Sequence, residues 1–172
     1  GNTGLSFGWV GIALLLLYFT YTGIKITAWR FKGIKILWPK EHPIRILYAS
    51  ESGKTMAVAY SFQKQLKKQG IKSKVSSINS FKYKEGIEQL FVFAATYGDG
   101  EPPSNGSKWK SALNSIPKNT SIQFSVLGFG SMFYPKYCKF GEDIDELLKE
   151  KLGLTRIIPL HKVNQQSVVD YK

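Results

Sequence analysis

The sequence contains few of the residues that build disulfides and metal clusters. Cys138 is the only cysteine among 172 residues, and there are two histidines. A single cysteine excludes an intramolecular disulfide and a cysteine-based metal cluster. This composition fits a reducing compartment, where disulfides are rare.

Acidic residues are scarce as well. The chain has 12 Asp and Glu against 24 Lys and Arg, which gives a formal net charge of +12. A surface with this balance attracts anionic lipid, nucleic acid or an acidic partner. Lysines that only keep the protein soluble would produce the same balance. With 43% hydrophobic and 14% aromatic residues, the chain still has enough apolar side chains for a packed core.

Charge is absent altogether from the first 24 residues. Residues 10–19 are strongly apolar, and about 20 such residues suffice to cross a bilayer as a helix. Basic residues follow from Lys25 onward, which by the positive-inside rule places the rest of the chain in the cytoplasm. A cleaved signal peptide is the alternative, but its positive charges would precede the apolar run. We therefore predict a membrane protein with one transmembrane helix in residues 1–30, followed by a basic linker at 31–43.

Strand and helix patterns alternate from Ile44 to the end of the chain. Apolar runs predict strands at 44–49, 73–78, 90–95, 121–127 and 156–160, and helical spacing predicts helices at 55–69, 105–115 and 136–152. This alternation predicts an α/β fold with a doubly wound five-stranded parallel sheet. The unbroken run Leu90–Ala95 is typical of a strand buried on both faces. We expect residues 44–172 to form this domain, with a last helix that starts near Ser167 and is incomplete in this chain.

The loop Ser50–Thr55 follows the first predicted strand and precedes a helix. Backbone N–H groups at such a helix start, together with the hydroxyl groups of the loop, suit a phosphate monoester. The same residues imitate the end of the P-loop of nucleotide triphosphatases, but that motif requires a glycine where Tyr48 stands. A capped helix without any ligand is the structural alternative.

Two further loops follow strands whose carboxyl ends share this edge. In Thr96–Gly106, two glycines allow the backbone to lie close to a planar ring, and Tyr97 is placed to stack on that ring. In Leu127–Cys138, two more glycines follow a strand, and Tyr134 supplies a second aromatic side chain. Open α/β sheets bind their ligands at the carboxyl ends of the strands. The three loops together predict a site for one flavin mononucleotide (FMN).

From about Ile44 onward the chain resembles the flavodoxin-like FMN domain of diflavin reductases, the group that includes cytochrome P450 reductase and the sulfite reductase flavoprotein. Residues 50–55 match the S-x-T-G-x-T loop of that family, with Ser for Thr at the third position. Residues 95–102 match A-T-Y-G-[ED]-G-[DE]-P, and residues 128–134 match G-x-G-[NS]-x-x-Y. The tail, residues 159–167, is similar to the flavodoxin segment of bacterial PepSY-associated membrane reductases, in which a membrane helix leads directly into the FMN domain.

The resemblance implies that the first loop holds the phosphate, that Tyr97 and Tyr134 enclose the isoalloxazine ring, and that the Gly98 carbonyl meets the ring edge. No catalytic residue and no metal ligand is expected. Packing is favoured over chemistry for the cysteine in the third loop. The residues expected to contact FMN are Ser50, Glu51, Ser52, Gly53, Lys54, Thr55, Ala95, Thr96, Tyr97, Gly98, Asp99, Gly100, Leu127, Gly128, Phe129, Gly130, Ser131, Tyr134, Tyr137, Cys138 and Asn164.

The resemblance also implies a function: electron relay within an NAD(P)H-dependent flavoprotein reductase. FAD and NAD(P)H are expected on a separate domain, and FMN would pass electrons to a haem or metal acceptor. The expected partners are therefore membrane lipid, the FAD/NAD(P)H reductase domain and that acceptor, with no nucleic acid. Alternatives are the flavodoxin-like domain of a tRNA-modifying radical enzyme, a P-loop-type phosphate-binding protein, and a non-catalytic adaptor that uses the basic surface.

The chain departs from the family pattern in two places. Residues 164–166, Asn-Gln-Gln, stand where reductases of the P450 type carry acidic residues. FMN domains of this class usually dock through acidic surfaces, whereas this chain is basic. The last loop and the partner surface are therefore expected to differ from those of the P450-type reductases.

Overall fold

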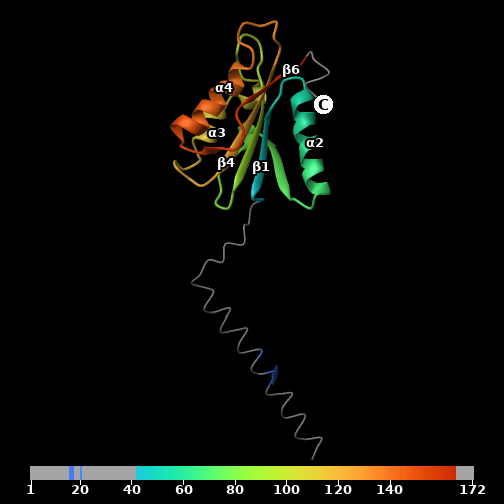
Figure 1. Ribbon diagram of the computed structural model, residues 1–172, viewed down its shortest axis with the longest axis vertical. Coiled ribbons are helices and arrows are strands. Elements are labelled where there is room, and N and C mark those ends of the chain that lie inside the picture. Colours follow the sequence, from blue (N-terminus) through green and yellow to red (C-terminus); the bar gives the residue numbers. More distant parts are fainter. Residues whose placement is uncertain (1–15, 18–19, 21–41, 166–172) are drawn as a thin grey trace, which may run out of the picture. The chain divides into compact units, whose positions relative to one another are not determined.

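The computed structural model describes residues 16–17, 20 and 42–165. The chain divides into two compact units, residues 1–38 and 39–172, and the fold below is that of the second (Figure 1). The predicted membrane helix falls almost entirely outside the described residues, as do most of the linker and the helix expected from Ser167. Within the residues that are described, no helix is both long and apolar enough to cross a bilayer.

A parallel sheet forms the centre of the second unit. Its strands are β1 (Ile44–Ala49), β2 (Ser73–Ser77), β3 (Gln89–Ala95), β4 (Gln123–Gly130), β5 (Thr155–Arg156) and β6 (His161–Asn164). The order is β2-β1-β3-β4-β5, and β6 also pairs with β4. Each of these pairings is parallel. The prediction of a doubly wound α/β sheet with five strand positions is confirmed.

Alternate residues of the central strands point to opposite faces of the sheet. In β3, Leu90, Val92 and Ala94 are fully buried in one hydrophobic cluster. Phe93 and Ala95 belong to a second, smaller cluster on the other face. The apolar run at 90–95 thus contributes to two cores, as its lack of alternating polarity predicts.

Helices cover the two faces of the sheet unequally (Figure 1). On one side lie α3 (Trp109–Leu113) and α4 (Lys139–Glu146), and the π-helical turn η3 (Leu147–Lys151) continues from α4. On the other side lies α2 (Lys54–Lys68). The short 3₁₀ turn η1 (Ile78–Ser80) follows β2, and a second one, η2 (Ser104–Gly106), ends the loop after β3. The larger core is therefore on the side of α3 and α4.

The predicted fifth strand, 156–160, is wrong in its extent. The structure pairs Thr155–Arg156 with the start of β4 and His161–Asn164 with its end. Between them, the Ile157 N–H donates to the carbonyl of Phe124 at 2.8 Å, and the chain then leaves the ladder. Pro159 has no N–H to donate, which explains the interruption.

Two predicted helices are shorter than their patterns indicate. The helix expected at 105–115 is reduced to α3, which is preceded by η2. The helix expected from residue 136 begins at Lys139, because Cys138 has a φ of +57°. A left-handed residue cannot belong to a right-handed helix, so the third loop extends to this position.

Candidate cofactor site

Three loops lie at the carboxyl edge of the sheet, after β1, β3 and β4. The Ser50 N–H, at the end of β1, donates to Oδ1 of Asn105 in the second loop at 2.8 Å. The Thr96 N–H, in the second loop, donates to the carbonyl of Phe129 at 2.8 Å. Each loop is thereby held to the next one. Asn105 is not among the residues that the sequence predicts, and its place in the turn-forming run Ser-Asn-Gly was the available signal.

The first loop presents the start of α2. Gly53 has a φ of +86°, a conformation that glycine adopts without strain, and its N–H donates to Oγ of Ser50 at 3.0 Å. No side chain caps α2, so backbone N–H groups of its first turn are available to an anion. The Thr55 hydroxyl is buried without a hydrogen-bond partner among the described residues, and Ser52 is exposed. This arrangement fits a phosphate monoester.

The charged residues of the loops have different environments. The Glu51 carboxylate accepts a hydrogen bond from the Ser104 N–H at 2.8 Å, so it holds the first loop to the second. Lys54 is the first residue of α2 and is exposed. Asp99 forms an exposed ion pair with Lys136 at 3.2 Å. In the part of the chain that the structure describes, no three His, Cys, Asp or Glu side chains gather to hold a metal ion.

The second loop is a narrow turn that exposes an aromatic ring. The backbones of Tyr97 and Glu101 exchange two hydrogen bonds of 2.8 Å each. Between them, Gly98 and Gly100 have φ values of +53° and +92°, which side-chain-bearing residues rarely adopt. The Tyr97 side chain is 53% exposed. The turn therefore holds a large ring at the surface of the edge.

The third loop also exposes apolar side chains. Tyr134 is 58% exposed, and its neighbours Met132 and Phe133 are exposed as well. The loop turns at Ser131, whose carbonyl accepts the Tyr134 N–H at 3.1 Å and whose hydroxyl accepts the Phe133 N–H at 3.3 Å. The edge thus carries exposed aromatic side chains from two loops that are hydrogen-bonded to each other.

Beneath the third loop the chain is packed tightly around Cys138. A Cβ on Gly130 would lie 3.0 Å from the backbone nitrogen of Cys138, and a Cβ on Gly128 would lie 3.1 Å from its Cβ. The Cys138 side chain is fully buried. Burial raises the pKa of its thiol from 9.0 to about 11, so the thiol stays protonated at neutral pH. The geometry supports a packing role for this cysteine.

The remaining predicted residues lie in or next to strands. Ala95 is buried at the end of β3. Leu127 and Phe129, in β4, line a groove on a face of the sheet. Asn164 is half-buried at the end of β6, and Tyr137 is half-buried next to the third loop. Most of the predicted residues are thus gathered at one edge, whereas the side chains of Leu127 and Phe129 belong to the groove.

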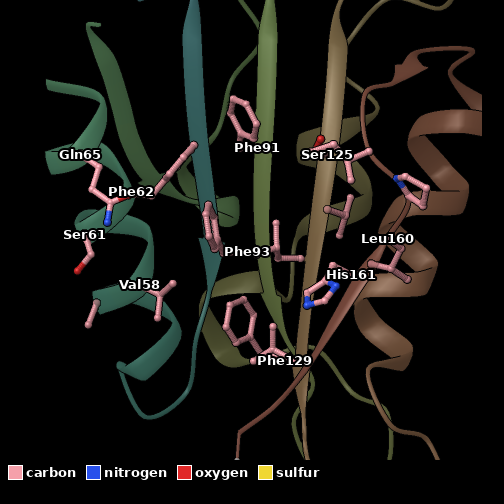
Figure 2. Close-up of a pocket in the computed structure, with 16 residues that line it drawn as sticks. Val58, Ser61, Phe62, Gln65, Phe91, Phe93, Ser125, Phe129, Leu160 and His161 are labelled. Carbon is pink, nitrogen blue, oxygen red and sulfur yellow. The ribbon is translucent and has the colours of Figure 1, made fainter. Parts of the chain in front are cut away.

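This groove, of about 910 Å³, is a feature that the sequence analysis does not predict (Figure 2). Figure 2 shows α2 side chains on one side, Leu160 and His161 on the other, and side chains of β3 and β4 between them. The Ser125 hydroxyl, which lines the groove, is buried without a partner among the described residues. Phe91 belongs to a strand that is expected to be buried on both faces, yet its side chain is only half-buried here. The groove lies on the sheet face, whereas the three loops lie at the edge.

Comparisons with known proteins agree with the geometry. The sequence model of the family described as Flavodoxin matches residues 46–171. The sulfite reductase [NADPH] flavoprotein alpha-component of Bacillus subtilis is 34% identical over 120 residues, which is 67% of this chain and 20% of that protein. The human inducible nitric oxide synthase is 32% identical over 127 residues, which is 72% of this chain and 11% of that protein.

A solved structure shows the same fold. Oxidised flavodoxin 1 from Bacillus cereus superimposes with a TM-score of 0.61 at 25% sequence identity, covering 74% of this chain and 88% of that one. The chain therefore corresponds in length to most of a flavodoxin. It spans a fifth or less of the two curated relatives.

Proposed function

Since the chain belongs to the flavodoxin family, we propose that it is the FMN module of a membrane-tethered, NAD(P)H-dependent flavoprotein reductase. The chain is an FMN-binding electron-transfer domain, homologous to the FMN modules of diflavin reductases. One observation carries the proposal further than the fold does: all three loops lie within the family match and at one edge of the sheet, and two of them carry an exposed tyrosine.

The residues at the start of α2 fit the phosphate of FMN. The Ser50 oxygen accepts the Gly53 N–H, which leaves its own proton free to donate. Ser52 is exposed, and the buried Thr55 hydroxyl has no partner among the described residues. Backbone N–H groups and the helix dipole add to the attraction for a dianion. These groups bind and orient the phosphate end of the cofactor.

The two exposed tyrosines fit the flat ring of FMN. Tyr97 and Tyr134 project from loops that are linked by the hydrogen bond from Thr96 to Phe129, so the spacing of the loops is fixed. Stacking on such rings removes apolar surface from water and keeps water off the faces of the ligand. When bound, FMN would supply a redox group that can carry one or two electrons. The chain itself is proposed to hold and orient the cofactor, without an acid, base or nucleophile of its own.

Three described residues of the first unit support the proposed membrane tether. Leu16, Leu17 and Thr20 are helical. The two leucines are 61% and 64% exposed, which is apolar surface that lipid would cover. The Thr20 hydroxyl lies 2.9 Å from the carbonyls of both leucines, so its proton is satisfied within the helix, as a bilayer requires. Because basic residues follow from Lys25 onward, we propose that the FMN domain is on the cytoplasmic side.

The proposed partners follow from how little of its curated relatives this chain covers. The sulfite reductase flavoprotein is named for NADPH, and this chain matches only 20% of it. We expect a reductase module with FAD and NAD(P)H to supply electrons from a separate region or protein. The electrons would leave singly, to a haem or another metal centre. Because the FMN loops form an exposed edge, both partners would approach the same side of the sheet.

The purified full-length chain tests the cofactor site directly. We expect it to contain FMN, identified by mass spectrometry of the flavin released on unfolding. The double substitution Tyr97→Ala/Tyr134→Ala removes both stacking surfaces and should weaken FMN binding on the order of a hundredfold. Tyr60→Ala is the matched control, because Tyr60 is an exposed tyrosine on α2 outside the three loops. Titration of the apoprotein with FMN, followed by flavin fluorescence, measures the difference.

Two results would contradict the proposal. A purified chain that holds no flavin and takes up none from solution would remove the electron-transfer function. Binding of ATP that depends on Lys54 and Mg²⁺ would instead favour a P-loop-type phosphate site. If FMN binds but the double variant binds it as well as the Tyr60 control, the cofactor is held by other residues.

A further inference from the structure

Lysines are concentrated in one stretch of the second unit. From Ser52 to Lys84 the sequence has eight lysines and no Asp or Glu. Four of these lysines, here called the lysine patch, come from the last turns of α2 and the loop that follows it. The patch consists of Lys64, Lys67, Lys68 and Lys72, all of them exposed. Among the described residues, no ion pair joins any of the four to a carboxylate.

The patch surrounds a depression of about 370 Å³. Lys64, Lys67 and Lys72 line it, together with polar groups of the neighbouring residues. The Gln63 side chain fixes α2 to the sheet here, because its amide donates to the carbonyl of Ser73 at 3.0 Å. The depression thus combines three lysine side chains with a glutamine that is hydrogen-bonded to the first residue of β2. Its other lining residues are His42, Tyr60, Gln63, Ile71 and Ser73.

The patch lies where the chain enters the domain. His42, the first described residue of the second unit, lines the depression itself. Ser73, which follows Lys72, pairs with Ile44, the first residue of β1. The lower end of the domain in Figure 1 is this amino edge of the sheet. The residues that precede position 42 are therefore joined to the domain next to the lysine patch.

We propose that the lysine patch binds the phosphate headgroups of anionic phospholipids. This inference rests on the membrane tether of the proposed function, because the chain leads from that tether into the domain at the amino edge of the sheet. Ammonium groups near an anionic leaflet each strengthen binding about fivefold. Ile71 is 37% exposed between Lys68 and Lys72, and an apolar side chain among cations suits the boundary between headgroups and acyl chains. Contact at this edge leaves the FMN loops, at the opposite edge, open to protein partners.

A structural role explains part of the same pattern. Lys67 and Lys68 are in the last turn of α2, where positive charge complements the helix dipole. That role requires no contact with lipid, and it does not account for Lys72, which lies beyond the helix, or for the depression. The experiment must therefore measure contact with the headgroups rather than stability.

The test uses the full-length chain in lipid nanodiscs made of phosphatidylcholine alone or mixed with phosphatidylglycerol. A membrane-impermeant acylating reagent modifies accessible lysines, and mass spectrometry gives the rate at each one. In discs with phosphatidylglycerol we expect the rates at the four patch lysines to fall about fivefold, since lipid phosphates occupy the ammonium groups. High salt should restore them because it screens the attraction. Lys108 and Lys110, exposed residues in and beside α3 on the other side of the sheet, are internal controls whose rates should not change.

A pair of variants separates the patch from net charge. Lys67→Glu/Lys72→Glu reverses two lysines that line the depression, and Lys108→Glu/Lys110→Glu makes the same change of charge elsewhere. Hydrogen exchange of the backbone at residues 69–73 is the readout. Slower exchange in phosphatidylglycerol discs should be lost in the first variant and kept in the second. FMN binding should be retained by both, which verifies that they fold.

The possible outcomes distinguish this inference from the tether. The lipid site is overturned if the patch lysines are acylated at the same rate in both kinds of disc. It is also overturned if Lys108 and Lys110 are protected as strongly as the patch lysines are. Equal acylation of the patch in both kinds of disc is also expected if the patch binds an acidic protein. A chain that fails to float with phosphatidylcholine vesicles but floats with phosphatidylglycerol vesicles at low salt contradicts the tether and supports the patch. A chain that floats with neither contradicts both.

Discussion

At the carboxyl edge of the sheet, the exposed side chains include the aromatic rings of Tyr97 and Tyr134, whereas beside α2 at the amino edge they include four lysines. The carboxyl edge also contains the left-handed glycines of the cofactor loops and a tightly packed cysteine. The amino edge instead ends α2 with a basic turn next to the entry of the chain. A single sheet thus separates the proposed cofactor site from the proposed membrane contact by the length of its strands.

This separation has a consequence for electron transfer. In the proposed function, a cofactor at the edge farthest from His42 would remain accessible to a reductase module and to an acceptor. Substitutions at the two edges should therefore differ in their effects on stability.

The largest difference is expected between two ion pairs. Near the amino edge, Arg156 Nε donates to Asp145 Oδ1 at 2.9 Å, and Asp145 is 8% exposed. Asp145→Ala should lower the free energy of unfolding by about 3 kcal/mol, because it leaves a largely buried guanidinium without its partner. At the carboxyl edge, Asp99→Ala breaks the exposed pair with Lys136 and should cost about 0.5 kcal/mol. Urea unfolding of both variants measures the contrast, and equal losses would contradict it.

A smaller difference is expected between two glycines. A Cβ on Gly141, beneath the cofactor loops, would lie 2.9 Å from the Cα of Gly128. Gly141→Ala should therefore cost about 2–3 kcal/mol, because a helix must move away from a strand. Gly70, at the amino edge, has a φ of +77° but no atom within 4 Å of an added Cβ. Gly70→Ala should cost about 1 kcal/mol, from backbone strain alone. If thermal and urea unfolding show that Gly70→Ala is more destabilising than Gly141→Ala, the backbone is not packed more closely at the carboxyl edge than at the amino edge.

The smallest effect is expected from the thiol of Cys138. Burial raises its pKa from 9.0 to about 11, so the unfolded chain loses this proton at lower pH than the folded chain does. The contribution of the thiol to stability is complete below pH 9 and falls as the pH rises toward 11. Over this window, the free energy of unfolding should fall by about 1–2 kcal/mol more in the native chain than in Cys138→Ala. Identical pH profiles for the two proteins would show that the thiol is not shielded.

Much of the site could be predicted because it depends on local sequence. Glycine at positions 98 and 100 is required by positive φ values, and a glycine before α2 is required in the same way. The position of a loop after an apolar strand is also enough to place it at the carboxyl edge of a parallel sheet. By contrast, the roles of Glu51 and Asn105 depend on which loops become neighbours. Their hydrogen bonds cross more than fifty residues of sequence, so no local pattern reveals them.

The groove shows a second limit. Phe91 lies within an unbroken apolar run, from which burial on both faces is expected. It is only half-buried, because the helices among the described residues leave this part of the sheet face uncovered. The interrupted fifth strand has a similar cause: its apolar residues satisfy the pattern of a strand, but Pro159 removes a donor from the ladder.

By itself, the sequence determined the order of strands and helices, the three loops and the excess of positive charge, since each follows from residue type and spacing along the chain. Only the tertiary structure decided that three lysines from a helix end and the next loop line one depression, and that Cys138 is enclosed beneath the third loop. Exposure and proximity depend on which distant segments pack together, and that is a property of the folded chain as a whole.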